Sequence, residues 1–124
     1  MRDHWIGAVA LVCAGGSLAA ESPPVWEGYW SHDPAWCSRA GDVGEATPDW
    51  YGRDGLFGME WSCDIEQVAP TALSRAWVLR TTCLDAGESY SGTWIFLVTP
   101  DDRLVILDET GVTAEMVRCK GDGT

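Results

Sequence analysis

Apolar and polar residues alternate strictly through the middle of the chain. Between residues 59 and 66 every odd position is apolar and every even position is polar or charged. A period of two is typical of a β-strand with one buried and one solvated face. Further strand-like segments lie at 26–30, 75–84, 90–98, 103–107 and 112–119. Residues 94–98 are apolar on both faces, which predicts a central strand covered on both sides.

Turn-forming residues separate these segments. Glycine, proline and aspartate at 85–89, 99–102 and 108–111 predict tight turns, and Pro70 marks 68–73 as a connection. Asp33-Pro34 predicts the start of a short helix, which Gly41 ends. The Gly-, Pro- and acid-rich segment 41–55 predicts an irregular loop. We therefore expect an all-β fold: a small antiparallel meander that forms a barrel or a strongly coiled sheet.

The first twenty residues have the pattern of a targeting segment. Arg2 lies in a short polar start, residues 6–14 are mainly apolar, and Ser17 and Ala19 suit a signal-peptidase cut. The apolar run is shorter than the roughly 20 residues needed to span a bilayer. We predict a signal peptide at 1–20 and a single β domain at 21–124, with no stable membrane insertion after cleavage. An amphipathic first helix and a lipidated Cys13 are the alternatives.

Cysteine number and spacing predict a disulfide framework. After the signal segment the chain contains Cys37, Cys63, Cys83 and Cys119. An even number in a short exported chain predicts two disulfides, and hence a periplasmic or secreted protein. Three pairings are possible; we favour Cys37–Cys63 with Cys83–Cys119, because neighbouring elements of a meander meet first. No Cys-x-x-Cys pair points to a zinc or redox site.

Acidic side chains dominate the charge. The net charge is −11 at pH 7, and loss of the signal segment leaves it unchanged because Arg2 and Asp3 cancel. Such a field repels nucleic acids and anionic membrane surfaces, so we expect no nucleic-acid partner. The charge either suits a basic protein partner or keeps a small secreted domain soluble.

The sequence offers little for catalysis. His32 is the one histidine of the domain, and without a Gly-x-Ser-x-Gly motif a surface loop is the simpler interpretation. Carboxylates crowd residues 42–54 but lack the spacing of a calcium loop. We therefore predict a protein that is not an enzyme and has no catalytic residue, cofactor or metal.

Seven tryptophans follow the signal segment, and four of them are of two different kinds. Trp61, Trp77 and Trp94 occupy strand positions and are most simply core residues. Trp50 and Tyr51 lie in the expected loop, where exposed aromatic residues commonly anchor a binding surface. A lid folded over one end of the barrel is the alternative for this pair.

One resemblance covers most of the mature chain. Its motifs are Trp26-x-Gly28-x-Trp30, Asp33-Pro34-x-x-Cys37, Glu60-x-x-Cys63, Trp77 before Cys83, Leu104 after a tight turn, and Arg118-Cys119. In these the chain resembles a group of small, exported, uncharacterised cysteine-containing β-domain proteins of Gram-negative bacteria. The resemblance implies a fold and a compartment but no activity.

Two shorter likenesses imply functions. Gly28-x-Trp30 is similar to the start of lipocalin- and avidin-type barrels, which hold small ligands. Ser91-Gly92-Thr93-Trp94 is similar to the Ser-Gly-x-x-Tyr loop of periplasmic lysozyme inhibitors, although Trp94 stands one position early and is not tyrosine. The second likeness adds Ser91 and Gly92 to Trp50 and Tyr51 as the candidate binding surface.

Two binding functions and one structural role follow from these observations. The protein is either a binding module that inhibits a basic protein such as lysozyme, or a small-ligand barrel with Trp26, Trp30 and Trp77 lining a cavity. A structural envelope protein is the third possibility. The ligand, the closure of the barrel, the presence of a cavity and the oligomeric state stay open.

Overall fold

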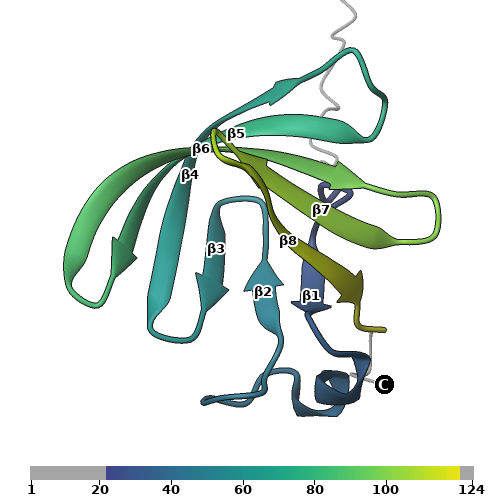
Figure 1. Ribbon diagram of the computed structural model, residues 1–124, viewed down its shortest axis with the longest axis vertical. Coiled ribbons are helices and arrows are strands. Elements are labelled where there is room, and N and C mark those ends of the chain that lie inside the picture. The colour runs from purple at the N-terminus through teal and green to yellow at the C-terminus, as the bar shows by residue number, and fades with distance from the viewer. Residues whose placement is uncertain (1–21, 121–124) are drawn as a thin grey trace, which may run out of the picture.

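Eight antiparallel strands follow one another in chain order around a closed barrel (Figure 1). The computed structural model describes residues 22–120, so the predicted signal peptide, Cys13 and the last four residues lie outside the described residues. The strands are β1 (Gly28–Ser31), β2 (Asp49–Tyr51), β3 (Gly55–Gly58), β4 (Trp61–Pro70), β5 (Ala76–Asp85), β6 (Glu88–Val98), β7 (Arg103–Asp108) and β8 (Gly111–Arg118). The expected all-β meander is confirmed, and its closure is settled because β8 pairs with β1.

The core fills the interior of the barrel. Because side chains alternate across a strand, each strand sends every second residue inward. The most deeply buried large side chains come from five different strands: Trp30, Leu79, Phe96, Leu104 and Met116. Residues 94–98 do not form a strand covered on both faces, because the barrel wall is a single layer. Ile95 on the outer face of β6 is 38% exposed, whereas Phe96 on the inner face is 1% exposed.

The predicted short helix is present as the 3-10 helix η2 (Pro34–Arg39). The Asp33 carboxylate accepts a hydrogen bond of 2.9 Å from the backbone N–H of Ala35, as expected of an N-cap. The helix lies against β1, near the end of β8 in Figure 1. Within residues 22–120 no helix has both the length and the apolar character needed to cross a membrane.

Two expected connections are strands. The segment 41–55, predicted as a loop, contains β2 and the first residue of β3, so Trp50 and Tyr51 lie on a strand. β2 has only three residues, which is too short to show an alternating pattern in the sequence. The connection predicted at 68–73 begins later, because β4 continues to Pro70 after a bulge between Ile65 and Gln67. Proline is tolerated there because β3 pairs with β4 only from Trp61 to Asp64, so Pro70 lies on a stretch of β4 whose edge β3 does not cover.

One end of the barrel is closed by the segment that precedes β1. The Trp26 indole donates to the Gly52 carbonyl at 3.0 Å, and the Trp30 indole donates to the Trp26 carbonyl at 2.8 Å. The Arg118 guanidinium lies 4.3 Å from the centre of the Trp30 ring and donates to the carbonyls of Glu27 and Val25. Arg118 also forms a 2.9 Å ion pair with Asp102 in the β6–β7 turn. These contacts tie the entering segment, β8 and a turn together into a plug.

Two disulfides are present, as predicted, but the favoured pairing is wrong. The bridges are Cys63–Cys83 and Cys37–Cys119. Cys63 and Cys83 are directly opposite each other on β4 and β5, with Cα atoms 3.9 Å apart. Cys37 lies on η2 and reaches Cys119 because closure of the barrel brings the end of β8 to β1, where the Cys119 N–H donates to Tyr29. Both bridges are consistent with an oxidising compartment.

Candidate functional site

A cavity of about 310 Å³ opens at the end of the barrel opposite the plug. It lies where β1, β3, β5 and β7 end and where β2, β4, β6 and β8 begin; the β3–β4 and β5–β6 turns of this end are at the lower left of Figure 1. The lining residues are His32, Asp49, Tyr51, Leu56, Trp61, Asp85, Tyr90, Trp94, Phe96, Ile106, Thr113, Ala114 and Met116. Five of them are aromatic, and they come from β2, β4 and β6.

Tyr51 connects the aromatic walls of the cavity. Its ring centre lies 6.3 Å from that of Trp61 and 5.5 Å from that of Phe96. Tyr51 and Phe96 form the floor, since both are almost completely buried, while Trp61 and Trp94 are half-buried and Tyr90 is exposed at the rim. The most buried part of the cavity wall is therefore largely aromatic.

Two glycines make room for the tryptophan rings. A Cβ atom at Gly58 would overlap the Trp61 ring, which lies over the backbone of the neighbouring strand. A Cβ atom at Gly92 would lie 3.1 Å from the Trp94 indole nitrogen and 3.2 Å from the Thr81 hydroxyl. Because glycine lacks this atom, each indole can lie close to the backbone of the barrel wall.

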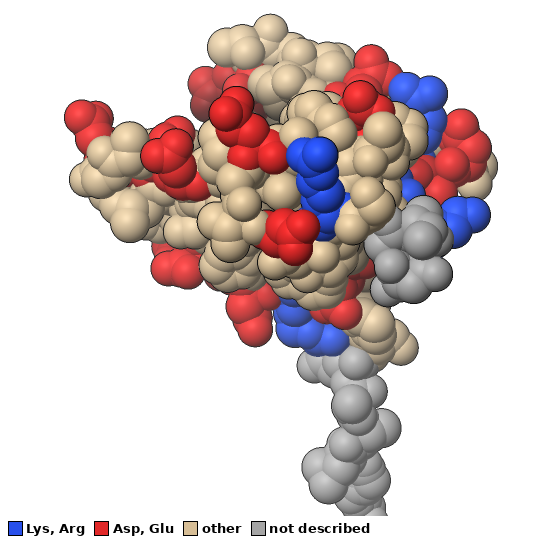
Figure 2. Space-filling view, turned by 90° about the horizontal axis from the view of Figure 1, so that it is seen from below, with Lys and Arg blue, Asp and Glu red and all other residues tan. Residues whose placement is uncertain are grey.

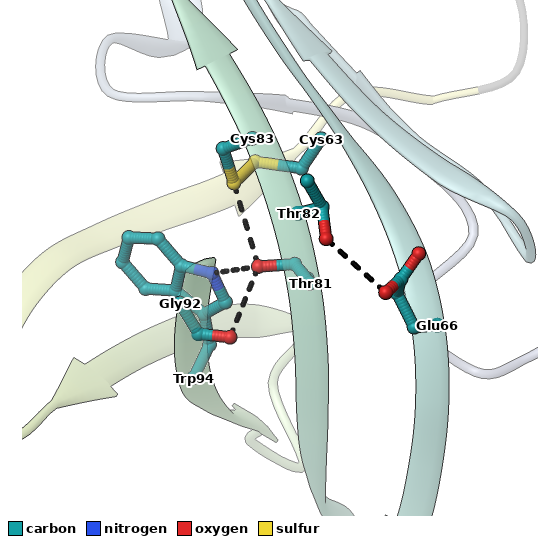
Figure 3. Close-up of a disulfide and its surroundings, with 7 residues drawn as sticks. All are labelled: Cys63, Glu66, Thr81, Thr82, Cys83, Gly92 and Trp94. Atoms are coloured by element: carbon teal, nitrogen blue, oxygen red, sulfur yellow. Dashed lines mark hydrogen bonds between the residues drawn. A yellow bond between two sulfur atoms is a disulfide. The ribbon is translucent and has the colours of Figure 1, made fainter. Parts of the chain in front are cut away.

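Thr81 fixes the orientation of Trp94 (Figure 3). The Trp94 indole N–H donates to the buried Thr81 hydroxyl at 2.9 Å, and that hydroxyl donates to the Gly92 carbonyl at 3.2 Å. Thr81 also lies 3.4 Å from the Cys83 sulfur of the Cys63–Cys83 bridge. The ring of Trp94 is therefore held by a hydrogen-bonded group that is itself anchored beside a covalent cross-link.

A carboxylate and a tyrosine form a hydrogen-bonded pair in the wall. The Tyr51 hydroxyl donates to an Asp49 carboxylate oxygen at 2.9 Å and lies 3.7 Å from the Met116 sulfur. Burial raises the pKa of Asp49, while the Tyr51 hydrogen bond and the nearby His32 act in the opposite direction. Burial, followed by the charge and hydrogen bond of Asp49, raises the pKa of Tyr51 well above 10.0. Tyr51 therefore remains a donor at ordinary pH.

The mouth of the cavity is acidic. Asp85 lies directly opposite Trp61 across the β4–β5 pair, and Glu88 faces Asp85 across the β5–β6 turn. Figure 2, seen from below Figure 1, shows carboxylates and no lysine or arginine along its left side, the side of the β5–β6 turn. Among the described lining residues, neither lysine nor arginine is present.

The predicted binding residues are divided among three places. Tyr51 lies in the cavity wall, and Ser91 and Gly92 border a smaller hollow that shares Tyr90 and Trp94 with the cavity. Ser91 and Gly92 lie within β6, opposite Thr82 and Thr81, and do not form a loop. Trp50 lies outside the barrel, where its ring is 4.9 Å from that of Tyr29.

The tryptophans expected to line a cavity do not line this one. Trp30 has no exposed surface, because it packs inside the plug beneath Arg118. Trp26 and Trp77 are in edge-to-face contact at 5.1 Å and border a separate hollow at the plugged end. The mouth cavity instead uses Trp61 and Trp94, which the strand pattern alone had indicated as core residues.

Neither metal coordination nor comparison with known proteins identifies this site. Within residues 22–120 no group of three or more His, Cys, Asp or Glu side chains is placed to hold a metal ion. No protein-family model matches the chain, and no curated protein or solved structure matches it. Functional inference therefore depends on the chemistry of the cavity.

Proposed function

We propose that this protein is an exported binding protein that holds a small ligand in the cavity at the mouth of its barrel. The observation that carries the proposal is a cavity of about 310 Å³ with five aromatic side chains in its wall, in a barrel whose other end is plugged. Ligand sites are typically concave, largely apolar and supplied with a few polar groups that fix orientation. Asp49, Asp85 and the Tyr51 hydroxyl provide such groups here.

The dimensions of the cavity limit the ligand. Typical small-molecule sites have volumes of roughly 300–1,000 Å³, so this cavity is at the lower end of the range. A compact ligand of one ring or a branched alkyl group suits it better than a long lipid chain. Because the plug closes the far end, such a ligand would enter and leave through the acidic mouth.

Export into the periplasm or medium is part of the proposal. The disulfides are consistent with an oxidising compartment, and the apolar N-terminal segment has the pattern of a signal peptide. A ligand available to the protein would then be a compound present outside the cytoplasm.

Capture of a basic protein such as lysozyme is a second candidate. The observation in its favour is the net charge of −11 together with carboxylates at the mouth. Such a complex would associate faster at low salt and weaken as salt rises. Salt-sensitive binding of lysozyme, with no response to small compounds, would favour this candidate over the first.

A fluorescence screen tests the proposed function. Trp61 and Trp94 line the cavity, so binding of a small compound should change tryptophan emission in a saturable manner. The half-buried Ala114 on β8 lines the same cavity, and Ala114→Phe should fill it and reduce affinity at least about tenfold, corresponding to roughly 1.4 kcal/mol. Ala69→Phe on the exposed face of β4 is the matched control and should leave binding unchanged. Absence of any saturable response across the screen would contradict the proposal.

A further inference from the structure

We infer that the ligand is a small organic cation, an alkylammonium group held against the aromatic walls with Asp49 and Asp85 as counter-charges. This inference rests on the proposed small-ligand function and assigns its chemical class. It stands on the composition of the cavity: aromatic side chains and two carboxylates line it, and the described lining includes no lysine or arginine.

The aromatic surface supplies the first part of the argument. The face of an aromatic ring carries negative charge density that attracts a cation within about 6 Å of the ring centre, most strongly for tryptophan. Trp61 and Trp94 are half-buried at the cavity, with Tyr51 and Phe96 beneath them. Several rings around one compact space are the arrangement by which proteins recognise quaternary ammonium groups.

The carboxylates supply the second part. Asp49 is half-buried in the wall, and its hydrogen-bond partner Tyr51 is a neutral donor that does not cancel its charge. Asp85 lies at the mouth opposite Trp61, so a cation near the Trp61 ring would also be near a carboxylate. A neutral ligand would gain no charge–charge attraction from Asp49 or Asp85, and an anion would be repelled by both.

The glycines and Thr81 show that the rings are held in place before a ligand binds. Gly58 admits Trp61, Gly92 admits Trp94, and the Thr81 hydroxyl accepts the Trp94 N–H at 2.9 Å. Rings that are already oriented lose little conformational entropy on binding. The walls are therefore suited to a rigid, compact cationic group.

The test uses three probes of one shape and different charge. Choline is positive, its carbon isostere dimethylbutanol is neutral, and dimethylbutanoate is negative. The oxidised protein is titrated with each, and binding is followed by tryptophan fluorescence and calorimetry. We expect choline to bind about fivefold to thirtyfold more tightly than dimethylbutanol, which is the effect of a cation–π contact of roughly 1–2 kcal/mol, and dimethylbutanoate to bind most weakly.

Variants separate the two parts of the argument. Trp61→Leu keeps an apolar side chain but removes a ring face, so it should weaken choline about threefold to thirtyfold and dimethylbutanol much less. Trp50→Leu is its matched control, because the Trp50 ring packs against Tyr29 and does not line the cavity. Asp85→Asn should weaken choline a few-fold at low salt and less at high salt. Asp64→Asn removes the same charge from the exposed face of β4 and should have no effect.

The outcomes distinguish the inference from the function beneath it. The cation assignment would be overturned if choline and dimethylbutanol bound with equal affinity. It would also be overturned if the screen found neutral ligands and choline did not bind. Either result would leave the small-ligand function standing. Failure of all probes and of the entire screen would overturn both. Equal losses of the two probes in Trp61→Leu would show that the ring acts only as apolar surface.

Discussion

Single residues decide the electrostatics of the mouth, and Asp49 is the clearest case. Its carboxylate is half-buried in the cavity wall, accepts from Tyr51 and lies in a group that also includes the titratable residues His32, Asp85 and Tyr90. Burial raises its pKa above the ordinary value of 3.8. The charged form is therefore less favoured in the folded protein than in the unfolded chain.

This shift predicts the pH dependence of stability at Asp49. Because the folded protein retains the proton to higher pH, the contribution of Asp49 to stability is greatest below pH 3.8 and is lost as pH rises through the raised pKa. Asp49→Asn retains an acceptor for the Tyr51 hydroxyl but does not titrate. The free energy of unfolding is measured by urea titration at about pH 3 and at about pH 7. Relative to Asp49→Asn, that of the wild type should be lower at the higher pH. If the wild-type free energy of unfolding fell by the same amount relative to Asp64→Asn, the pH dependence would not originate at Asp49 in the cavity wall.

At the scale of elements, the tight turns show where the chain is under conformational constraint. The β5–β6 turn has two central residues, Ala86 and Gly87, with φ of 51° and 87°. Positive φ at both positions matches a type I′ turn, which suits the twist of a hairpin and favours Asn-Gly. Glycine adopts this conformation easily, whereas an alanine there is strained.

Ala86→Asn should therefore stabilise the protein. Asparagine tolerates the left-handed region, and removal of the strain should raise the free energy of unfolding by roughly 0.5–1 kcal/mol. Ala72→Asn, in the exposed connection between β4 and β5, is the control and should change stability by less than about 0.5 kcal/mol. A lower denaturation midpoint for Ala86→Asn than for the wild type would contradict the prediction that Ala86 is strained in this turn.

The strands themselves were largely predictable, and the exceptions have physical causes. Trp61 to Glu66 alternates because the inner face of β4 is more buried than the outer face, whereas Met59 and Glu60 lie in the turn before β4, where Met59 is 46% exposed. β2 was missed because three residues cannot display a period and Gly, Pro and Asp surround them. The apolar outer face of β6 suggested a second covering layer, but a closed barrel of this size leaves Ile95 partly in solvent.

At the scale of the whole molecule, the barrel depends on a short seam. β1 and β8 share only two paired positions, Trp30 with Arg118 and Ser31 with Val117. The seam is reinforced by the Cys37–Cys119 bridge, by the Cys119 N–H donating to Tyr29 at 2.8 Å, and by Arg118. Covalent support thus lies at one of the two strand pairs that share only two paired positions, the other being β2 with β3.

The two bridges should differ in their contribution to stability. Cys37–Cys119 joins residues 82 apart and Cys63–Cys83 joins residues 20 apart. In the chain-entropy model these loops correspond to about 4.5 and about 3.3 kcal/mol. Replacing both cysteines of a pair by alanine should therefore cost about 1 kcal/mol more for Cys37–Cys119, as measured by chemical denaturation. All four cysteines are buried, so loss of packing should be similar; a larger loss for Cys63–Cys83 would contradict this ranking.

The cavity could not be predicted from sequence, because its residues meet only through the register of the closed barrel. Asp49, Trp61, Asp85 and Trp94 are far apart along the chain and belong to four strands. One usable signal was present: Gly92-x-Trp94 and the close spacing of Gly58 and Trp61 place a glycine beneath an indole. Gly28-x-Trp30 has the same spacing but lies in the plug, so that signal alone does not separate cavity from core.

The long Cys37–Cys119 connection also bears on how the protein matures. In a chain that emerges N-terminus first into an oxidising space, Cys37 and Cys63 are present before Cys119. The pairing that nearness in sequence favours, Cys37 with Cys63, is then a kinetic trap that must be undone by thiol–disulfide exchange. Early formation of the β4–β5 hairpin, which aligns Cys63 with Cys83, protects against it. We therefore expect correct oxidation to require that this local hairpin form before Cys37 and Cys119 link the two ends of the barrel.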